Sequence, residues 1–139
     1  MSAGTARVAY NFAVLRVVPH VFLGTFANLG VILHAPTTAF LDAQLLTDPA
    51  ALRRCAPDVD QDLLLRYLHA YAAVCRGEES AGPLALLPPS ERFHWLTAPR
   101  SDVLQSSPIH AGVTTDPGAT LAALFESQVA APLRRAIDP

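Results

Sequence analysis

The stretch RVAYNFAVLRVVP, residues 7–19, constrains the fold more than any other part of the chain. It is rich in Val, Tyr and Phe and ends at a proline, which predicts a β-strand over residues 8–18. Successive side chains of a strand point to opposite faces. One face would carry Tyr10, Phe12, Val14 and Val18, and the other Ala9, Ala13, Leu15 and Val17. Because both sets are apolar, we expect a central strand covered on both sides.

Two further strands are predicted over residues 26–36 and 38–46, joined by the short PTT connection as a hairpin. Gly30, inside the second of them, indicates a bulge or the close approach of another backbone. Farther along the chain, residues 102–113 look extended and are interrupted by Pro108. Arg16 lies on the Tyr10 face of the first strand, so it must reach a rim or a carboxylate.

The helices are indicated by their start and stop signals. Asp48 and Pro49 predict one or two helical turns, and the clearest helix is expected from an Asp58 cap, with Gln61 completing a capping box, to a stop at Gly77. A short turn or helix is expected from Ser90. A last helix begins with Asp116 as its cap and Pro117 in its first turn, and Pro132 would kink or end it. The order of elements predicts an α+β fold, an antiparallel sheet of three to four or more strands with two main helices packed mostly on one face.

Length and composition suggest a single domain over residues 1–139, with residues 1–6 frayed and 78–90 a Pro- and Gly-rich internal connection. The net charge of −2 argues against a nucleic-acid partner. All ten basic residues are arginine, which excludes lysine chemistry. Two scattered cysteines favour a reducing cytoplasm. We see neither a signal peptide nor a run of ~20 apolar residues, so no membrane partner is expected. With 51% hydrophobic and 16% charged residues, an exposed apolar face that meets a partner is the favoured reading, and a very compact core is the other.

The sequence contains no complete catalytic motif, no metal-binding cluster and no phosphate-binding loop, and we predict neither a metal nor a cofactor. One alternative is an acyl-transfer site with Ser107 or Ser101 as the nucleophile and His110 as its base. Residues three apart on a strand point to opposite faces, although the intervening proline can undo that alternation. The alternatives for His110 are a bond to backbone at a strand end, or contact with a ligand or partner.

Other candidate residues each have two readings. Arg100 and Ser101 can hold a phosphate or carboxylate, or can form an internal ion pair with an aspartate, and Arg92 fits either arrangement. Trp95 is expected in the core, as is Phe93, and a binding platform is its alternative. Asp58, Asp60 and Asp62 resemble a calcium loop but lack its glycine and glutamate, so we treat them as helix N-terminal charges. Cys75 is expected in the core rather than as a reactive thiol.

Four segments, YNFAVLRVVP, FANLGVIL, RFHWLTAPRSDVLQSSPIHAG and DPGATLAALFESQV, resemble the bacterial family catalogued as domain of unknown function 3037. The resemblance implies a small stand-alone cytoplasmic protein and supplies no reaction. It also implies a protein partner, a HipA-like kinase encoded by a neighbouring gene. The family's motif positions fall on Tyr10, Arg16, Pro19, Asn28, Gly30, Arg92, Trp95, Arg100, Ser101, Gln105, Ser107, Pro108, His110 and Gly112.

The chain departs from the family pattern before the second strand, where Leu23 and Thr25 replace an arginine and a glutamate. An apolar patch at Val21, Phe22 and Leu23 would then face a partner. We therefore expect a non-enzymatic binding or accessory protein that acts as a homodimer or beside a larger enzyme. The alternative is a small enzyme or sensor for an anionic or phosphorylated ligand. In that case Arg16, Arg92, Arg100, Ser101 and His110 would converge on one pocket.

Overall fold

The computed structural model describes residues 6–19, 25–99 and 103–137. Five strands form an antiparallel sheet in the order β3-β2-β1-β4, and β5 also pairs with β1. The strands are β1 Val8–Val17, β2 Ala27–Ala35, β3 Phe40–Leu45, β4 Leu104–Ser106 and β5 His110–Thr114. The α-helices are α1 Pro49–Cys55, α2 Gln61–Cys75, α3 Pro89–Thr97, α4 Pro117–Phe125 and α5 Ala131–Ile137. The α+β class and the antiparallel sheet are thus confirmed.

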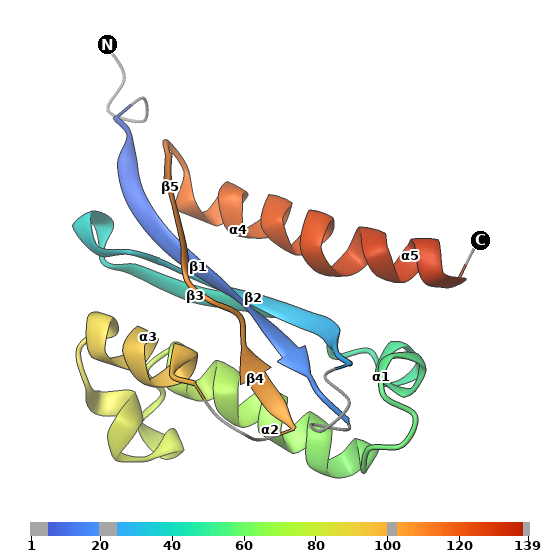
Figure 1. The fold of residues 1–139 in the computed structure, drawn as a ribbon. Helices are drawn as coiled ribbons and strands as arrows, with labels where there is room; N and C mark the ends of the chain where they lie inside the picture. The colour runs from blue at the N-terminus through green and yellow to red at the C-terminus, as the bar shows by residue number, and fades with distance from the viewer. Residues whose placement is uncertain (1–5, 20–24, 100–102, 138–139) are drawn as a thin grey trace.

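The helices lie on both faces of the sheet, and not mostly on one face as the sequence analysis expected (Figure 1). Leu64 and Leu68 of α2 pack with Leu15 and Ile32 in one buried cluster. Leu121 of α4 belongs to a second cluster with alternate residues of β2. The physical reason is the apolar character of both faces of β1 and β2, since each face needs its own cover. The prediction that the first strand is central and covered on both sides is confirmed.

Gly30 lies beside a bulge and is closely approached by another strand, the two features that a glycine inside a strand predicted. The pairing of β1 with β2 shifts between Leu15 and Arg16, so that Leu29 is the extra residue of a bulge. A Cβ on Gly30 would lie 2.4 Å from Leu45 Cδ2 and 2.9 Å from the Gln44 carbonyl oxygen. Strand β3 therefore approaches β2 more closely than any larger residue at position 30 permits.

The predicted helix starts are confirmed at two of three positions. Asp48 accepts a hydrogen bond from the Ala51 N–H, and Asp116 accepts one from the Ala119 N–H, each with a proline following. Helix α2 begins two residues later than expected, with Asp60 rather than Asp58 as its cap. The predicted capping-box partner, Gln61, is the first residue of the helix rather than its third. Its amide donates to the backbone before the helix, to the carbonyls of residues 56 and 59, and thereby fixes the entry of the chain.

The connection after α2 is folded back on the helix by short 3₁₀ turns, η4 Glu79–Ala81 and η5 Pro83–Leu86. Gly77 ends α2 with φ of 72°, in the left-handed region that glycine adopts freely, so its predicted role as a helix stop is confirmed. Arg92 Nη1 donates to the Leu87 carbonyl at 2.6 Å and ties this connection to α3. Leu84 and Leu86 nevertheless remain exposed.

The C-terminal helix does not end at Pro132, although its geometry changes before that residue. Residues Glu126–Ala130 form a π-helical turn, η6, between α4 and α5. Pro132 has no N–H to donate to the carbonyl four residues earlier, that of Gln128. Asn28 of β2 supplies the missing donor, because its Nδ2 lies 2.9 Å from the Gln128 oxygen. The kink that the proline predicted is thus realised as a π turn held on the sheet by a side chain.

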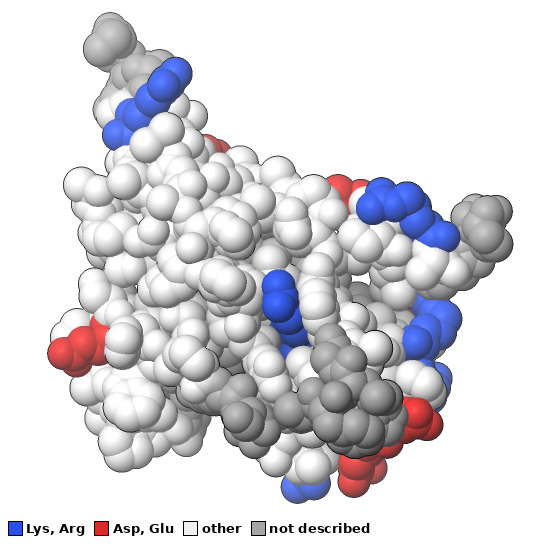
Figure 2. All heavy atoms as spheres, viewed as in Figure 1, with Lys and Arg blue, Asp and Glu red and all other residues white. Residues whose placement is uncertain are grey.

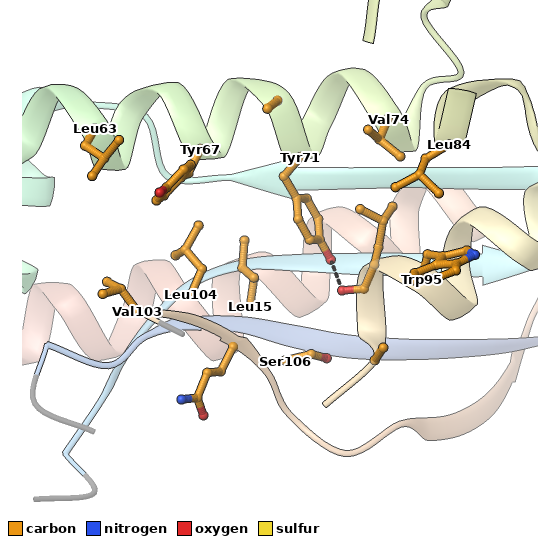
Figure 3. Close-up of a pocket in the computed structure, with 14 residues that line it drawn as sticks. Leu15, Leu63, Tyr67, Tyr71, Val74, Leu84, Trp95, Val103, Leu104 and Ser106 are labelled. Carbon is orange, nitrogen blue, oxygen red and sulfur yellow. Dashed lines mark hydrogen bonds between the residues drawn. The ribbon is translucent and has the colours of Figure 1, made fainter. Parts of the chain in front are cut away.

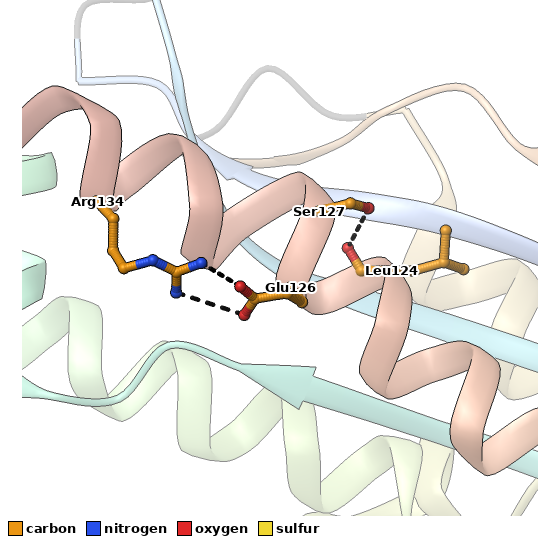
Figure 4. Close-up of polar contacts among 4 residues, drawn as sticks. All are labelled: Leu124, Glu126, Ser127 and Arg134. Atoms are coloured by element: carbon orange, nitrogen blue, oxygen red, sulfur yellow. Dashed lines mark hydrogen bonds and ion pairs between the residues drawn. The ribbon is translucent and has the colours of Figure 1, made fainter.

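Side chains on the solvent side of this turn bond within the helix itself (Figure 4). Arg134 pairs with Glu126 across the π turn, and the Ser127 hydroxyl donates to the Leu124 carbonyl at 3.2 Å. The hydrogen bond from Arg134 lowers the pKa of the Glu126 carboxyl. Both partners are exposed, so this ion pair contributes little to stability.

Among residues 6–19, 25–99 and 103–137, no helix is both long and apolar enough to cross a lipid bilayer.

Candidate functional site

The described residues enclose an apolar groove of about 400 Å³ between α2, α3 and β4 (Figure 3). We call it the α2–α3 groove. Helix α2 forms its roof, strands β1 and β4 its floor, and Trp95 and Leu84 one end. It is lined by Leu15, Leu63, Tyr67, Ala70, Tyr71, Val74, Leu84, Trp95, Leu96, Ala98, Val103, Leu104, Gln105 and Ser106.

The roof of the groove exists because α2 carries two apolar stripes. The buried residues of the helix are Leu64, Leu68, Tyr71, Ala72 and Cys75. All of these except Ala72 belong to the buried cluster that includes Leu15 and Ile32. A second stripe at helical spacing, Leu63, Tyr67 and Val74, lies beside the first. It points toward Leu104 and Leu15, and Val74 and Leu104 pack against the edge of the core cluster there (Figure 3). The Tyr71 hydroxyl donates to the Leu96 carbonyl at 3.5 Å and joins the roof to α3.

Aromatic side chains line the mouth of the groove with part of their surface in solvent. Trp95 is 49% exposed and Tyr67 is 48% exposed, although each packs against the lining. Phe93 is buried, as expected for a core residue, whereas Trp95 is not buried and fits the alternative reading as a binding platform. Half-exposed Trp and Tyr side chains are typical of binding surfaces, because an apolar ring is joined to a polar group.

None of the described residues that line the groove carries a formal charge. These residues therefore supply no guanidinium, ammonium or carboxylate for binding an anion or for proton transfer at neutral pH. Its chemistry favours an uncharged, apolar occupant that makes few hydrogen bonds. The smaller recess between α2 and β3 contains both His69 and Arg76, but it has little apolar wall.

Arg16 and Asn28 are neighbours across β1 and β2 on the α4 face of the sheet. The Arg16 guanidinium carbon lies 4.2 Å from the centre of the Phe26 ring, a cation–π contact. Among the described residues no carboxylate pairs with Arg16, and the expectation that it reaches a rim or a carboxylate stays a prediction. Arg16 Nε and Asn28 Oδ1 are buried and have no hydrogen-bond partner among the described residues.

Arg92 belongs to the opposite side of the sheet from Arg16. Besides its bond to Leu87, it approaches His34, a histidine that is 4% exposed and packs on Phe93 with 5.4 Å between ring centres. Burial lowers the pKa of His34, and the positive charge of Arg92 lowers it further. Cys75 is also buried, and desolvation raises its pKa to about 12, so the thiol is protonated and unreactive at neutral pH. The expectation that Cys75 is a core residue is confirmed.

Ser107 performs a backbone role where the edge of the sheet is interrupted. Its N–H donates to the Val14 carbonyl, and its hydroxyl oxygen accepts from the Val14 N–H, both at 2.8 Å. The same hydroxyl donates to the Pro108 carbonyl at 2.8 Å. Because the Ser107 hydroxyl is buried and bonded on both sides, this geometry does not support a nucleophile. His110 is exposed, and its ring packs on Phe12 with 5.2 Å between centres.

Of the residues on which an anion pocket was predicted to depend, the structure separates Arg92 from Arg16 and His110. Arg92 lies with α3, whereas the side chains of Arg16 and His110 lie on the α4 face of the sheet. Gln105 is the cross-strand neighbour of Arg16 and lines the groove, as does Trp95. Five predicted site residues lie outside the described residues: Arg100, Ser101, Val21, Phe22 and Leu23. No group of three or more His, Cys, Asp or Glu side chains in the described ranges is placed to hold a metal ion.

The sequence analysis did not identify most of the groove. Of its lining residues, only Trp95 and Gln105 were among the predicted site residues. A visible signal existed, because apolar residues on α2 occupy a wider arc than one packed face needs. The partner of that second stripe, β4, is more than 25 residues away in sequence, so its proximity required the tertiary structure.

Comparison with known proteins gives one match. The model of the family described as "Protein of unknown function (DUF3037)" matches residues 12–129. Neither the curated proteins nor the solved structures contain a significant match to this chain.

Proposed function

This chain belongs to the DUF3037 family, whose description names no activity, and we propose that it is a non-enzymatic binding protein that holds apolar side chains of a protein partner in the α2–α3 groove. The observation that carries the proposal is an uncharged groove bordered by half-exposed Trp95 and Tyr67. Trp and Tyr dominate the energetics of protein interfaces, because they bury a large apolar area and retain a polar group.

A protein partner explains the surface better than a small ligand alone. Apolar exposure continues beyond the groove along η5, where Leu86 is 65% exposed next to Leu84 of the lining. A small molecule seated in about 400 Å³ would leave that extension uncovered. Large apolar side chains grouped on one surface mark sites of macromolecular contact.

The groove itself is tested with Nile red, an uncharged apolar probe. Trp95 is the only tryptophan of the chain, so quenching of its fluorescence by the probe reports binding at the groove. We expect Tyr67→Glu to weaken binding of the probe by at least about tenfold, because it buries a carboxylate in an apolar site. Val113→Glu, at an exposed position on β5, is the control and should bind normally. Equal binding by Tyr67→Glu and the wild-type protein would contradict the proposal.

The first partner to test is the HipA-like kinase that the family resemblance implies. Titration of the purified kinase into this protein, followed by calorimetry, should give a Kd that Tyr67→Glu and Trp95→Ala each raise by at least about tenfold, as expected for interface hot spots. Val113→Glu should leave that Kd unchanged. Binding of the kinase that is insensitive to both groove variants would overturn the groove as the docking surface.

A further inference from the structure

Strand β5 forms an open edge of the sheet. It pairs with β1 on one side, and on its other side no described strand pairs with it. His110, Ala111 and Val113 are exposed along it, and Val113 is 61% exposed. An edge strand presents unpaired N–H and C=O groups, which serve as a template for another strand.

The outward-facing backbone groups can be assigned from the hydrogen bonds of the neighbouring strand. The N–H and C=O of Val14 both point toward the β4–β5 side, because they bond to Ser107. These groups alternate in direction along a strand, so Phe12 and Tyr10 also point that way. Their partners on β5 are His110 and Gly112, whose backbone groups are therefore used within the sheet. By the same alternation, Ala111 directs its N–H and C=O outward. Val113 does likewise.

The edge lacks charged side chains, one of the features by which proteins prevent pairing of edge strands. Residues 103–115 contain no Asp, Glu, Lys or Arg. Charged side chains also lie mainly toward the margins of the molecular face seen in Figure 2. Pro108 interrupts the edge only before β5 begins. The opposite edge, β3, differs because it carries the charged residue Asp42.

We propose that β5 binds β5 of a second copy of this chain in antiparallel fashion, joining the two sheets across a two-fold axis. Centring the axis at Gly112 places Ala111 of each copy opposite Val113 of the other. The outward groups then form two hydrogen-bonded pairs, with about four backbone bonds. The surface is uncharged, so a second copy meets no like-charge repulsion, and the exposed Val113 side chains become buried. Such an interface is independent of the α2–α3 groove.

The occupant is a second copy because a two-fold axis makes the same short edge both donor and acceptor. One strand edge buries less area than a permanent dimer interface. We therefore expect a reversible dimer whose population rises with protein concentration. Sedimentation velocity of the full chain from about 1 to about 300 μM should show a monomer–dimer equilibrium, with a Kd in the micromolar range.

Two variants test the edge itself. Val113→Lys places two ammonium groups diagonally across the axis and should raise the dimer Kd by at least about tenfold, and a mixture of Val113→Lys and Val113→Glu should restore association. Ala111→Pro removes an outward-facing N–H that is not used within the sheet, so an edge strand can accept proline at this position. It should also abolish the dimer while leaving the circular dichroism spectrum unchanged. Leu86→Lys, at a site of similar exposure on η5, is the control and should dimerise normally.

The proposal is overturned by a wild-type protein that stays monomeric at the highest concentration, or by a dimer that both β5 variants retain. If Tyr67→Glu rather than Val113→Lys dissociates a dimer, the α2–α3 groove is the self-association site, and the edge pairing is wrong.

Discussion

Ser107 replaces a rung of the sheet with its own side chain. Between the β4 and β5 pairings, residues 108 and 109 stand opposite the single residue Ala13, so the edge strand is bulged there. Pro108 has no N–H, and the hydroxyl of Ser107 completes the bonding of Val14. The serine in this motif was considered as a nucleophile from sequence, because residue type alone does not reveal whether a hydroxyl is already bonded on both sides.

His34 is a buried histidine whose protonation opposes folding. Burial and Arg92 lower its pKa in the folded protein below the ordinary value of 6.5. Below pH 6.5 the unfolded chain therefore binds a proton that the folded chain does not. The free energy of unfolding should fall as the pH drops from 6.5 toward the lowered pKa, by at most about 1.4 kcal/mol per pH unit. Above pH 6.5 this contribution is fully present.

Urea unfolding between pH 5 and pH 8 measures this dependence. His34→Gln should flatten the curve below pH 6.5, because the titrating group is gone. His69→Gln, which changes an exposed histidine on α2, should keep the slope of the wild-type protein. The same slope in all three proteins would show that His34 is not the responsible group.

The C-terminal helix is fixed to the sheet by one exchange of hydrogen-bond partners. Pro132 leaves the Gln128 carbonyl without a helical donor, and Asn28 takes that place from β2. The proline made a kink predictable from sequence, but the choice of Asn28 as the replacement donor was not. The two residues are about a hundred positions apart, and a β-bulge beside Asn28 sets its orientation.

This exchange predicts that Asn28 and Pro132 are energetically coupled. Asn28→Ala should lower the free energy of unfolding by about 1 kcal/mol, because it leaves a carbonyl unpaired. In a Pro132→Ala background the new N–H can bond Gln128 directly, so the loss caused by Asn28→Ala should shrink. A double-mutant cycle from urea unfolding should give a coupling energy above about 0.5 kcal/mol. Additive effects would refute the exchange, and the cycle with Asn11→Ala in place of Asn28→Ala provides the matched control.

At the scale of the molecule, the sequence predicted the strands and the helices better than their arrangement. The extended edge segments around Pro108 and the central position of β1 follow from alternation and proline placement. The placement of α4–α5 on the second face was not anticipated, although Tyr10 and Phe12 already indicated that this face needed cover. Arg100 and Ser101, on which the anion-pocket alternative depended, lie outside the described residues, so that alternative stays a prediction.

The absence of charge from the α2–α3 groove predicts how salt affects binding there. The affinity for Nile red should change by less than about twofold between roughly 20 and 300 mM NaCl, a range over which the electrostatic screening length shortens several-fold. Binding of inorganic phosphate, the probe for the anion-pocket alternative, would instead weaken steeply over that range. Fluorescence titration of Trp95 at each salt concentration measures the first, and calorimetry measures the second. A steep loss of Nile red affinity would place a charge in the groove after all.

The pairing of β5 with β1 joins residues that are about a hundred positions apart, and it affects how the chain folds during synthesis. The ribosome releases β1, β2 and α2 before it has made β5 or α4. Until those last segments emerge, Val31 and Leu33 on the α4 face of the sheet have no cover. The nascent chain therefore spends the end of translation with one finished layer and one exposed apolar face, the stage at which folding intermediates are most prone to aggregate.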